Sequence, residues 1–91
     1  MRFEWSREKA AVNFAKHAVA FDEAITVFGD PLATTLSDGK HSGLEERFLT
    51  TGLTGRQRIV IVWHTHRGDA IRIIGAREVT LSERRTYESG E

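Results

Sequence analysis

The first third of the chain carries hydrophobic residues at helical spacing. A short extended segment, Phe3-Glu4-Trp5, is followed by Ser6, a residue type that favours helix N-caps. Apolar positions three and four residues apart then predict a helix from residue 7 to about residue 17. Its expected core stripe is Ala11, Phe14, Ala15 and Ala18, with Lys9, Asn13 and Lys16 on the opposite, polar face.

A second amphipathic helix is predicted after a short turn. Its apolar residues fall at the spacing of one helix face and are Phe21, Ala24, Ile25 and Phe28. Gly29 and the following Asp30-Pro31 prevent the helix from continuing. We expect both helices to pack on one side of a sheet, through Phe14, Phe21, Ile25 and Phe28.

After Pro31 the pattern changes from helical to extended, and four strands are predicted. They cover residues 32–36, 46–52, 56–66 and 70–77. The run at 59–63 is apolar on both sides, which is typical of a central strand. A polar loop is expected at 38–43, and Arg67-Gly68-Asp69 has the composition of a tight hairpin turn.

The C-terminal segment has a helix-start signature. Thr80 and Glu83 have the spacing of a capping box, so a helix is expected from there to about residue 88. The element order is therefore a short strand, two helices, an antiparallel four-stranded meander and a C-terminal helix, an α+β pattern. We expect residues 1–91 to form a single domain, because no linker-like stretch divides them.

Composition and charge exclude several classes of protein. The chain has no cysteine, so neither a disulfide framework nor a thiolate metal site is available. We expect a cytoplasmic protein, because the sequence shows no secretion signal and no apolar run of the roughly 18 residues that span a membrane. The formal net charge is zero, which argues against a free-standing nucleic-acid binder. All basic residues after Glu45 are nevertheless arginines, whose planar guanidinium suits phosphate.

Strand periodicity places a histidine and an arginine near each other in the last hairpin. His64 and Arg72 lie four residues to either side of Gly68, which predicts a cross-strand pair. Metal-free RNA cleavage needs a proton acceptor and a cationic clamp, because the 2′-hydroxyl attacks its own phosphate. Imidazole and guanidinium supply these groups. The alternative is that His64 merely ends a buried strand and Arg72 pairs with a surface carboxylate, and a one-residue register slip would separate them.

Other polar and aromatic positions have two interpretations each. His64 and His66 point the same way on a strand and could seat a metal, but no third ligand is evident, so no metal site is expected. Lys16-His17 at the end of the first helix could contact substrate or only complement the helix dipole. Trp5 and Trp63 are expected in the core rather than as base-stacking platforms.

Several short motifs occur in order along nearly the whole chain, from Phe3 to Glu88. They are Phe3-Glu4-Trp5, Asn13, Lys16-His17, Phe21, Ala24, Val27-Phe28-Gly29-Asp30-Pro31, Glu46-Arg47-Phe48, Gly52, His64-Thr65, Arg72-Ile73-Ile74-Gly75-Ala76-Arg77, Thr80, Glu83-Arg84 and Tyr87-Glu88. Together they resemble the BrnT-type toxin family. Two positions depart from the family pattern: Ala18 stands in place of a glycine, and Gly75 in place of a serine.

The resemblance implies a RelE-like α+β fold and a metal-independent endoribonuclease without a cofactor. It also implies neutralisation by a BrnA-type antitoxin, whose DNA-binding part would bring the toxin to operator DNA only indirectly. On this basis we predict His64 as general acid or base, with Arg72 and Arg77 clamping the scissile phosphate. The predicted RNA contacts are Arg47, Lys16, His17 and Arg84. The rival hypotheses are a non-catalytic corepressor that keeps only the antitoxin-binding surface, and an adaptor that binds protein alone.

Overall fold

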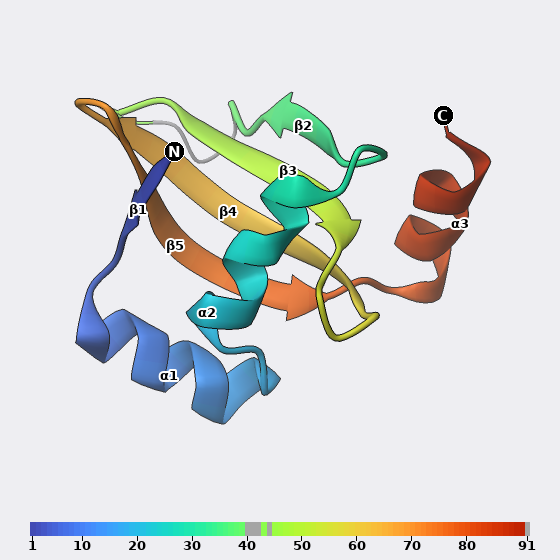
Figure 1. Ribbon diagram of the computed structural model, residues 1–91, viewed down its shortest axis with the longest axis horizontal. Coiled ribbons are helices and arrows are strands. Elements are labelled where there is room, and N and C mark those ends of the chain that lie inside the picture. The colour runs from blue at the N-terminus through green and yellow to red at the C-terminus, as the bar shows by residue number, and fades with distance from the viewer. Residues whose placement is uncertain (40–42, 44, 91) are drawn as a thin grey trace.

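A five-stranded sheet in the order β1-β5-β4-β3-β2 organises the molecule (Figure 1). The computed structural model describes residues 1–39, 43 and 45–90. The strands are β1 (Arg2–Glu4), β2 (Thr34–Ser37), β3 (Arg47–Leu53), β4 (Ile59–Arg67) and β5 (Ala70–Glu78). β2 to β5 form the predicted antiparallel meander with β4 at the centre, and β1 pairs parallel with β5. Positions 40–42 of the predicted polar loop lie outside the described residues.

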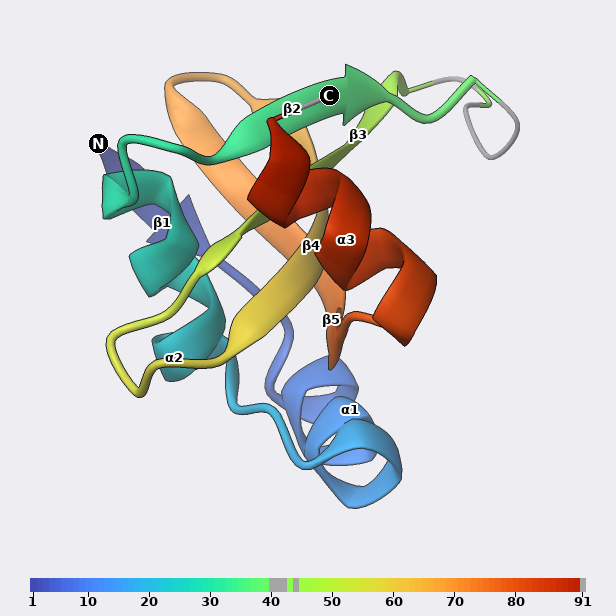
Figure 2. The same cartoon turned by 90° about the vertical axis from the view of Figure 1, so that its right-hand side faces the viewer.

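Two of the helices begin where the sequence predicts. α1 (Arg7–His17) has Ser6 as its N-cap, and the Ser6 hydroxyl accepts a hydrogen bond from the backbone N–H of Lys9. α3 (Leu81–Ser89) starts with the predicted capping box, in which Thr80 and Glu83 each accept from the other's backbone N–H. In Figure 2, as in Figure 1, α3 lies apart from the other helices.

The second predicted helix has a different form. α2 (Phe21–Ala24) is a single turn, and the chain continues as the 3-10 helix η1 (Ile25–Gly29). Because a 3-10 helix is wound more tightly, the inward positions shift along the chain. Val27, which lay outside the predicted stripe, is fully buried, whereas Phe28 is only half-buried.

α2 and η1 cover one side of the sheet, which we call the core face. Its buried cluster is Val19, Phe21, Ala24, Val27, Val60, Val62, Ile71, Ile73 and Ala76. Side chains alternate along a strand, so β4 directs Val60, Val62 and His64 to this side. The other side, which we call the open face, receives Ile61, Trp63 and Thr65 from β4. On the open face, Thr65 of the central strand therefore lies beside basic side chains of the neighbouring strands, Arg47 of β3 and Arg72 of β5.

The predicted orientation of the first helix is wrong. Its expected core stripe, Ala11, Phe14, Ala15 and Ala18, is exposed, and Phe14 is 55% accessible. Asn13, expected on the polar face, points inward with Ala10 instead. The reason is that α1 lies against an edge of β5 that β1 leaves uncovered, and an edge presents unpaired backbone polar groups. The Asn13 side chain donates to the carbonyl of Ala76 and accepts from its N–H.

Candidate functional site

The predicted pairing of His64 with Arg72 is wrong. Arg67 pairs with Ala70 across a two-residue turn, so the hairpin is centred between Gly68 and Asp69 rather than on Gly68. Arg72 therefore lies opposite Thr65, and the two side chains lie on the open face. His64 lies opposite Ile73 and points to the core face. A shift of one residue in register thus puts the two predicted catalytic groups on opposite sides of the sheet.

His64 is buried among aromatic rings. It is 3% exposed, its ring packs edge-on against Phe28 with centroids 5.0 Å apart, and it stacks with Phe48 at 5.9 Å. Its Nε2 lies 2.7 Å from the hydroxyl of Thr50, while Nδ1 has no hydrogen-bond partner among the described residues. Burial, together with the nearby His66, lowers the pKa of His64 to about 4. The imidazole is therefore neutral near pH 7, and its predicted catalytic role stays a prediction without geometric support.

Arg72 instead belongs to a basic pocket on the open face. Cross-strand pairing aligns Glu4, Arg72, Thr65 and Arg47 in one row over β1, β5, β4 and β3. The pocket has a volume of about 420 Å³, and its lining residues are Lys9, Gly43, Glu45, Arg47, Thr65, Arg67, Arg72 and Ile74. Four of these side chains are cationic and one is acidic. The pocket thus brings together the predicted residues Arg47 and Arg72.

Ion pairs hold Arg67 and Arg72, two of the arginines that line the basic pocket. Arg72 Nη1 donates to the Glu4 carboxylate at 2.8 Å, and both side chains are about one-third exposed or less. Arg67 lies 3.7 Å from the carboxylate of Glu45, with both side chains more than half exposed. The half-buried Glu4 carboxylate fixes the position of the Arg72 guanidinium within the row of Glu4, Arg72, Thr65 and Arg47. The Arg67–Glu45 pair is longer and more exposed, so it contributes less to stability.

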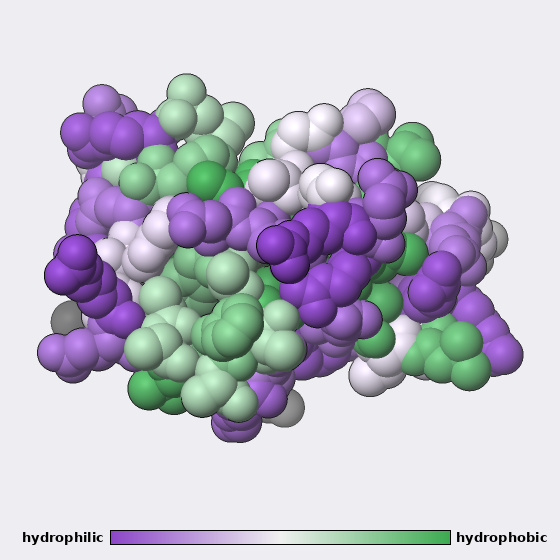
Figure 3. All heavy atoms as spheres, turned by 60° about the horizontal axis from the view of Figure 1, so that its bottom comes forward, coloured by the Kyte–Doolittle hydropathy of each residue, from purple (hydrophilic) through white to green (hydrophobic). Residues whose placement is uncertain are grey.

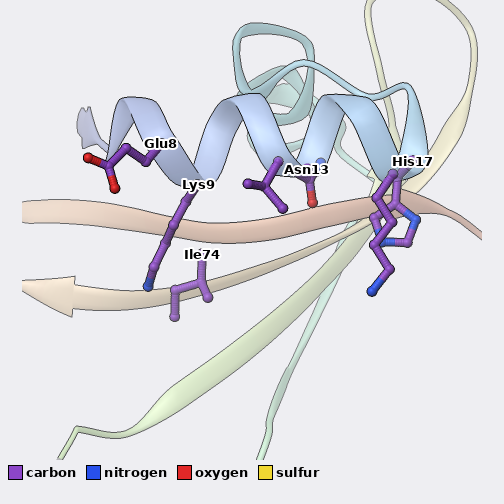
Figure 4. Close-up of a pocket in the computed structure, with 7 residues that line it drawn as sticks. Glu8, Lys9, Asn13, His17 and Ile74 are labelled. Carbon is purple, nitrogen blue, oxygen red and sulfur yellow. The ribbon is translucent and has the colours of Figure 1, made fainter.

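A second hollow, the α1 groove, runs between α1 and β5 (Figure 4). It has a volume of about 470 Å³, and its lining residues are Glu8, Lys9, Val12, Asn13, Lys16, His17 and Ile74. Lys9 and Ile74 also line the basic pocket, so the two hollows form one continuous surface. The predicted residues Lys16 and His17 therefore lie on the same surface as Arg47 and Arg72.

Arg77 lies on the open face, contrary to the expected alternation. Trp63 pairs with Gly75 and His64 with Ile73, so Ile74 is an extra residue in β5 that forms a bulge. The bulge brings Arg77 to the face of Arg72, where its guanidinium lies 5.4 Å from the ring centre of Trp63. Trp63 is half-buried there and is not in the core, so its predicted place is wrong.

Arg77 also holds the C-terminal helix. Its two terminal nitrogens donate to the two carboxylate oxygens of Glu83, at 2.8 and 3.0 Å. This pairing lowers the pKa of Glu83 to about 2. Arg84 pairs with Glu88 one turn along α3 and lines a separate pocket of about 310 Å³ at the end of the sheet. Neither Arg77 nor Arg84 lines the basic pocket.

Sequence reasoning did not single out Lys9, Thr65 or Arg67 as site residues. Lys9 could have been found, because it lies seven positions before Lys16 and hence on the same side of a helix. Thr65 and Arg67 are two residues apart on β4 and so lie on the same side of the sheet. That Arg47 and Arg72 lie beside Thr65 can be known only from the strand register. Long-range pairing therefore decides which side chains meet in the pocket.

Two findings bear on metal and membrane contacts. Within the described residues, no three His, Asp or Glu side chains gather where they could hold a metal ion. His64 and His66 are the two histidines considered as metal ligands, and Nε2 of His64 is hydrogen-bonded with the Thr50 hydroxyl. None of the described helices has the length and apolar character needed to cross a bilayer.

Comparison with known proteins identifies the family. A family described as "Ribonuclease toxin, BrnT, of type II toxin-antitoxin system" matches residues 5–83. The crystal structure of the Brucella abortus ribonuclease toxin BrnT superposes with a TM-score of 0.68 at 20% sequence identity, covering 88% of this chain and 97% of that chain. This likeness shows a shared fold. No curated protein sequence matches the chain. Because the family match spans all but the first and last few residues, the chain belongs to the BrnT ribonuclease toxins of type II toxin–antitoxin systems.

Proposed function

We propose that this toxin cleaves RNA without a metal ion and that the RNA lies along the basic pocket and the α1 groove. One observation carries the proposal: Lys9, Arg47, Arg67 and Arg72 converge from four elements on one pocket, although the chain has no net charge. Phosphates dominate the affinity of proteins for nucleic acid, so concentrated cations favour a backbone-binding site.

Arg47 and Arg72 are the proposed clamp on the scissile phosphate. They flank Thr65 in the strand row, so their Cα atoms are about 9–10 Å apart, two inter-strand spacings. Two arginine side chains at that separation can reach one phosphoryl group from opposite sides. Their fixed charges then stabilise the negative charge that builds on the phosphoryl oxygens in the transition state.

Proton transfer is assigned to Glu45 and Lys9, the titratable groups other than arginine among the described residues that line the pocket. The 2′-oxygen attacks its own phosphorus, its proton passes to the Glu45 carboxylate, and a 2′,3′-cyclic phosphate forms. The bond to the 5′-oxygen breaks, and that oxygen takes a proton from the Lys9 ammonium. Arginine cannot take either role, because it stays protonated in proteins.

The other predicted residues have separate places in the proposal. Lys16 and His17 contact the RNA further along the α1 groove, which they line. His64 as general acid or base is the rival assignment, and so is Arg77 as a second clamp. Arg84 contacts the RNA only if the bound RNA extends beyond the basic pocket to α3.

The proposed partner is a BrnA-type antitoxin, because membership of a type II toxin family implies a cognate antitoxin. The toxin then reaches operator DNA only through that partner, and its place of action is the cytoplasm. A neutral net charge is compatible with this arrangement, since the toxin itself has no need of DNA affinity.

Cleavage of a model RNA by the purified chain in excess chelator tests the proposal. We expect the wild type to cut, and Lys9→Met and Glu45→Gln each to lose on the order of 10²–10⁴-fold in rate. Arg85→Gln, at an exposed position of α3, is the matched control and keeps full activity. A wild type that binds its antitoxin tightly but cuts no RNA would instead support the corepressor hypothesis.

A further inference from the structure

The outer side of α1 is an apolar surface that the fold leaves uncovered. Beyond its first turn, the exposed apolar residues of α1 and its C-cap are Ala11, Val12, Phe14, Ala15 and Ala18. Val12 is 66% and Phe14 55% exposed. Figure 3 shows a pale-green area over α1, at the lower left, with hydrophilic groups around it. We call this set of residues the α1 patch.

The α1 patch does not serve the fold. The inward side of α1 is Ala10, Asn13 and His17, and the hydrogen bonds to Ala76 fix the helix in that orientation. Surface helices normally place polar residues outward, and a contiguous apolar surface marks an interaction site. α1 therefore turns two polar side chains, Asn13 and His17, inward and leaves a run of apolar side chains exposed.

We propose that the α1 patch is the docking site of an amphipathic helix of the cognate antitoxin and that the bound helix covers the α1 groove. The inference rests on the proposed function only for the consequence that RNA is excluded. Alanines at positions 11, 15 and 18 permit close approach of a second helix, and Phe14 supplies the anchor. Val12 belongs both to the patch and to the wall of the groove, so the two surfaces are continuous.

Charge identifies the chemistry of the partner helix. The flank of the patch is formed by Lys9 and Lys16, which also line the groove, and Arg7 stands at the start of the helix. Glu8 is the one carboxylate of α1. A partner with apolar residues on one face and Asp or Glu beside them matches this border. Its carboxylates would compete with RNA phosphates for Lys9 and Lys16.

The same charges disfavour a second copy of this chain on the patch. A symmetric dimer places the same surface of both copies in contact. In such a dimer Arg7, Lys9 and Lys16 of one copy would face the same three cations of the other, with only Glu8 to offset them. Like charges in contact weaken binding. The structure therefore favours an acidic partner over self-association.

Binding of the purified cognate antitoxin to the full chain tests the inference. Ala15→Glu changes a patch residue that lines neither hollow, and we expect it to raise the Kd for the antitoxin at least 10–100-fold. Ser82→Glu adds the same charge at an exposed position of α3 and leaves the Kd unchanged. Both variants should melt within about two degrees of the wild type, and free Ala15→Glu should cut RNA as the wild type does.

Three outcomes would overturn the inference. The first is an unchanged antitoxin Kd for folded Ala15→Glu. The second is an equal loss of affinity in Ser82→Glu, which would indicate a nonspecific charge effect. The third is a free wild type that is dimeric at micromolar concentration and becomes monomeric in Ala15→Glu, which would assign the patch to a second copy. A failure of RNA cleavage in the wild type would contradict the proposed function but leave the antitoxin measurement valid.

Discussion

The Asn13 side chain makes the two hydrogen bonds with the Ala76 backbone that a neighbouring strand would otherwise make. Its Oδ1 accepts from the Ala76 N–H at 3.0 Å, and its Nδ2 donates to the Ala76 carbonyl at 2.9 Å. The same Nδ2 donates to the carbonyl of Val19 at 3.0 Å. The Asn13 amide thus satisfies the backbone of the β5 edge where β1 no longer pairs with it. These hydrogen bonds fix the rotation of α1 about its axis. That rotation decides which α1 residues line the α1 groove and which form the α1 patch.

Asn13→Ala should lower the free energy of unfolding by about 2–3 kcal/mol, because three backbone groups lose their partner in a half-buried site. Val12→Ala, at the next and exposed position, should change it by about 0.5 kcal/mol or less. Urea unfolding of both variants measures the difference. Equal stabilities of the two would contradict the bridging role of Asn13.

A second long-range contact ties α2 to the β3–β4 turn. The carboxylate of Glu23, with its side chain 7% exposed, accepts from Arg58 through two nitrogens and from the Thr54 hydroxyl at 2.8 Å. The Arg58 hydrogen bond is the main reason why the pKa of Glu23 is lowered. We expect Glu23→Gln to destabilise by about 1–3 kcal/mol, because it removes the buried carboxylate from the Arg58 guanidinium. Arg58, whose side chain is 26% exposed, then keeps only the exposed carboxylate of Glu78 at 2.9 Å.

The matched control for Glu23→Gln is Glu88→Gln. Glu88 pairs with Arg84 at 3.2 Å with both side chains more than half exposed, so its loss should cost about 0.5 kcal/mol or less. Thermal or urea unfolding compares the two. If both substitutions cost the same, burial does not strengthen the Glu23–Arg58 pair.

The sequence predicted those features of the fold that depend on local signals. Caps at Ser6 and Thr80, the change of period after Pro31 and the apolar run of β4 lie within a few residues of what they determine. The orientation of α1 could not be predicted, because Asn13 acquires its inward place from Ala76, far away in the chain. An apolar stripe alone does not say whether it faces a core or a partner.

The site was harder to predict because it depends on strand register. Centring the last hairpin on Gly68 rather than between Gly68 and Asp69 exchanged Thr65 for His64 as the neighbour of Arg72. The bulge at Ile74 then reversed the face of Arg77. Two of the predicted site residues, Arg47 and Arg72, do line one pocket. Their roles stay a prediction, and their arrangement follows only from the pairing of three strands.

Docking of α3 should depend on the Arg77–Glu83 pair and on pH. Arg77→Gln should reduce hydrogen-exchange protection of the α3 amides, whereas Arg85→Gln should not. The pKa of Glu83 falls from 4.5 to about 2 in the fold, so its contribution is complete above pH 4.5 and is lost as pH falls toward 2. If Arg77→Gln leaves α3 protected but slows RNA cleavage 100-fold, Arg77 is a clamp, as the sequence suggested.

Arg72→Ala should lower the rate of RNA cleavage about 10²–10³-fold, the usual effect of removing one transition-state donor. Arg72→Lys should recover only part of this, because an ammonium lacks the guanidinium fork. The Glu4 pair is about one-third exposed, so the folded state should tolerate both changes. Arg85→Ala controls for the loss of one positive charge. Cleavage by Arg72→Ala at the wild-type rate would place the scissile phosphate elsewhere.

His64→Gln distinguishes a structural from a catalytic histidine. The pKa of His64 is about 4 in the fold against 6.5 unfolded, so below pH 6.5 the unfolded chain gains a proton that the fold excludes. Wild-type stability should therefore fall by about 3 kcal/mol between pH 6.5 and 4 through this group alone. In His64→Gln that part of the decline should disappear, as urea unfolding at several pH values would show. RNA cleavage at pH 7 should persist, because His64 is buried on the core face. A folded His64→Gln that keeps the acid-dependent decline and cuts RNA 10²–10⁴-fold more slowly would instead make His64 the general acid or base.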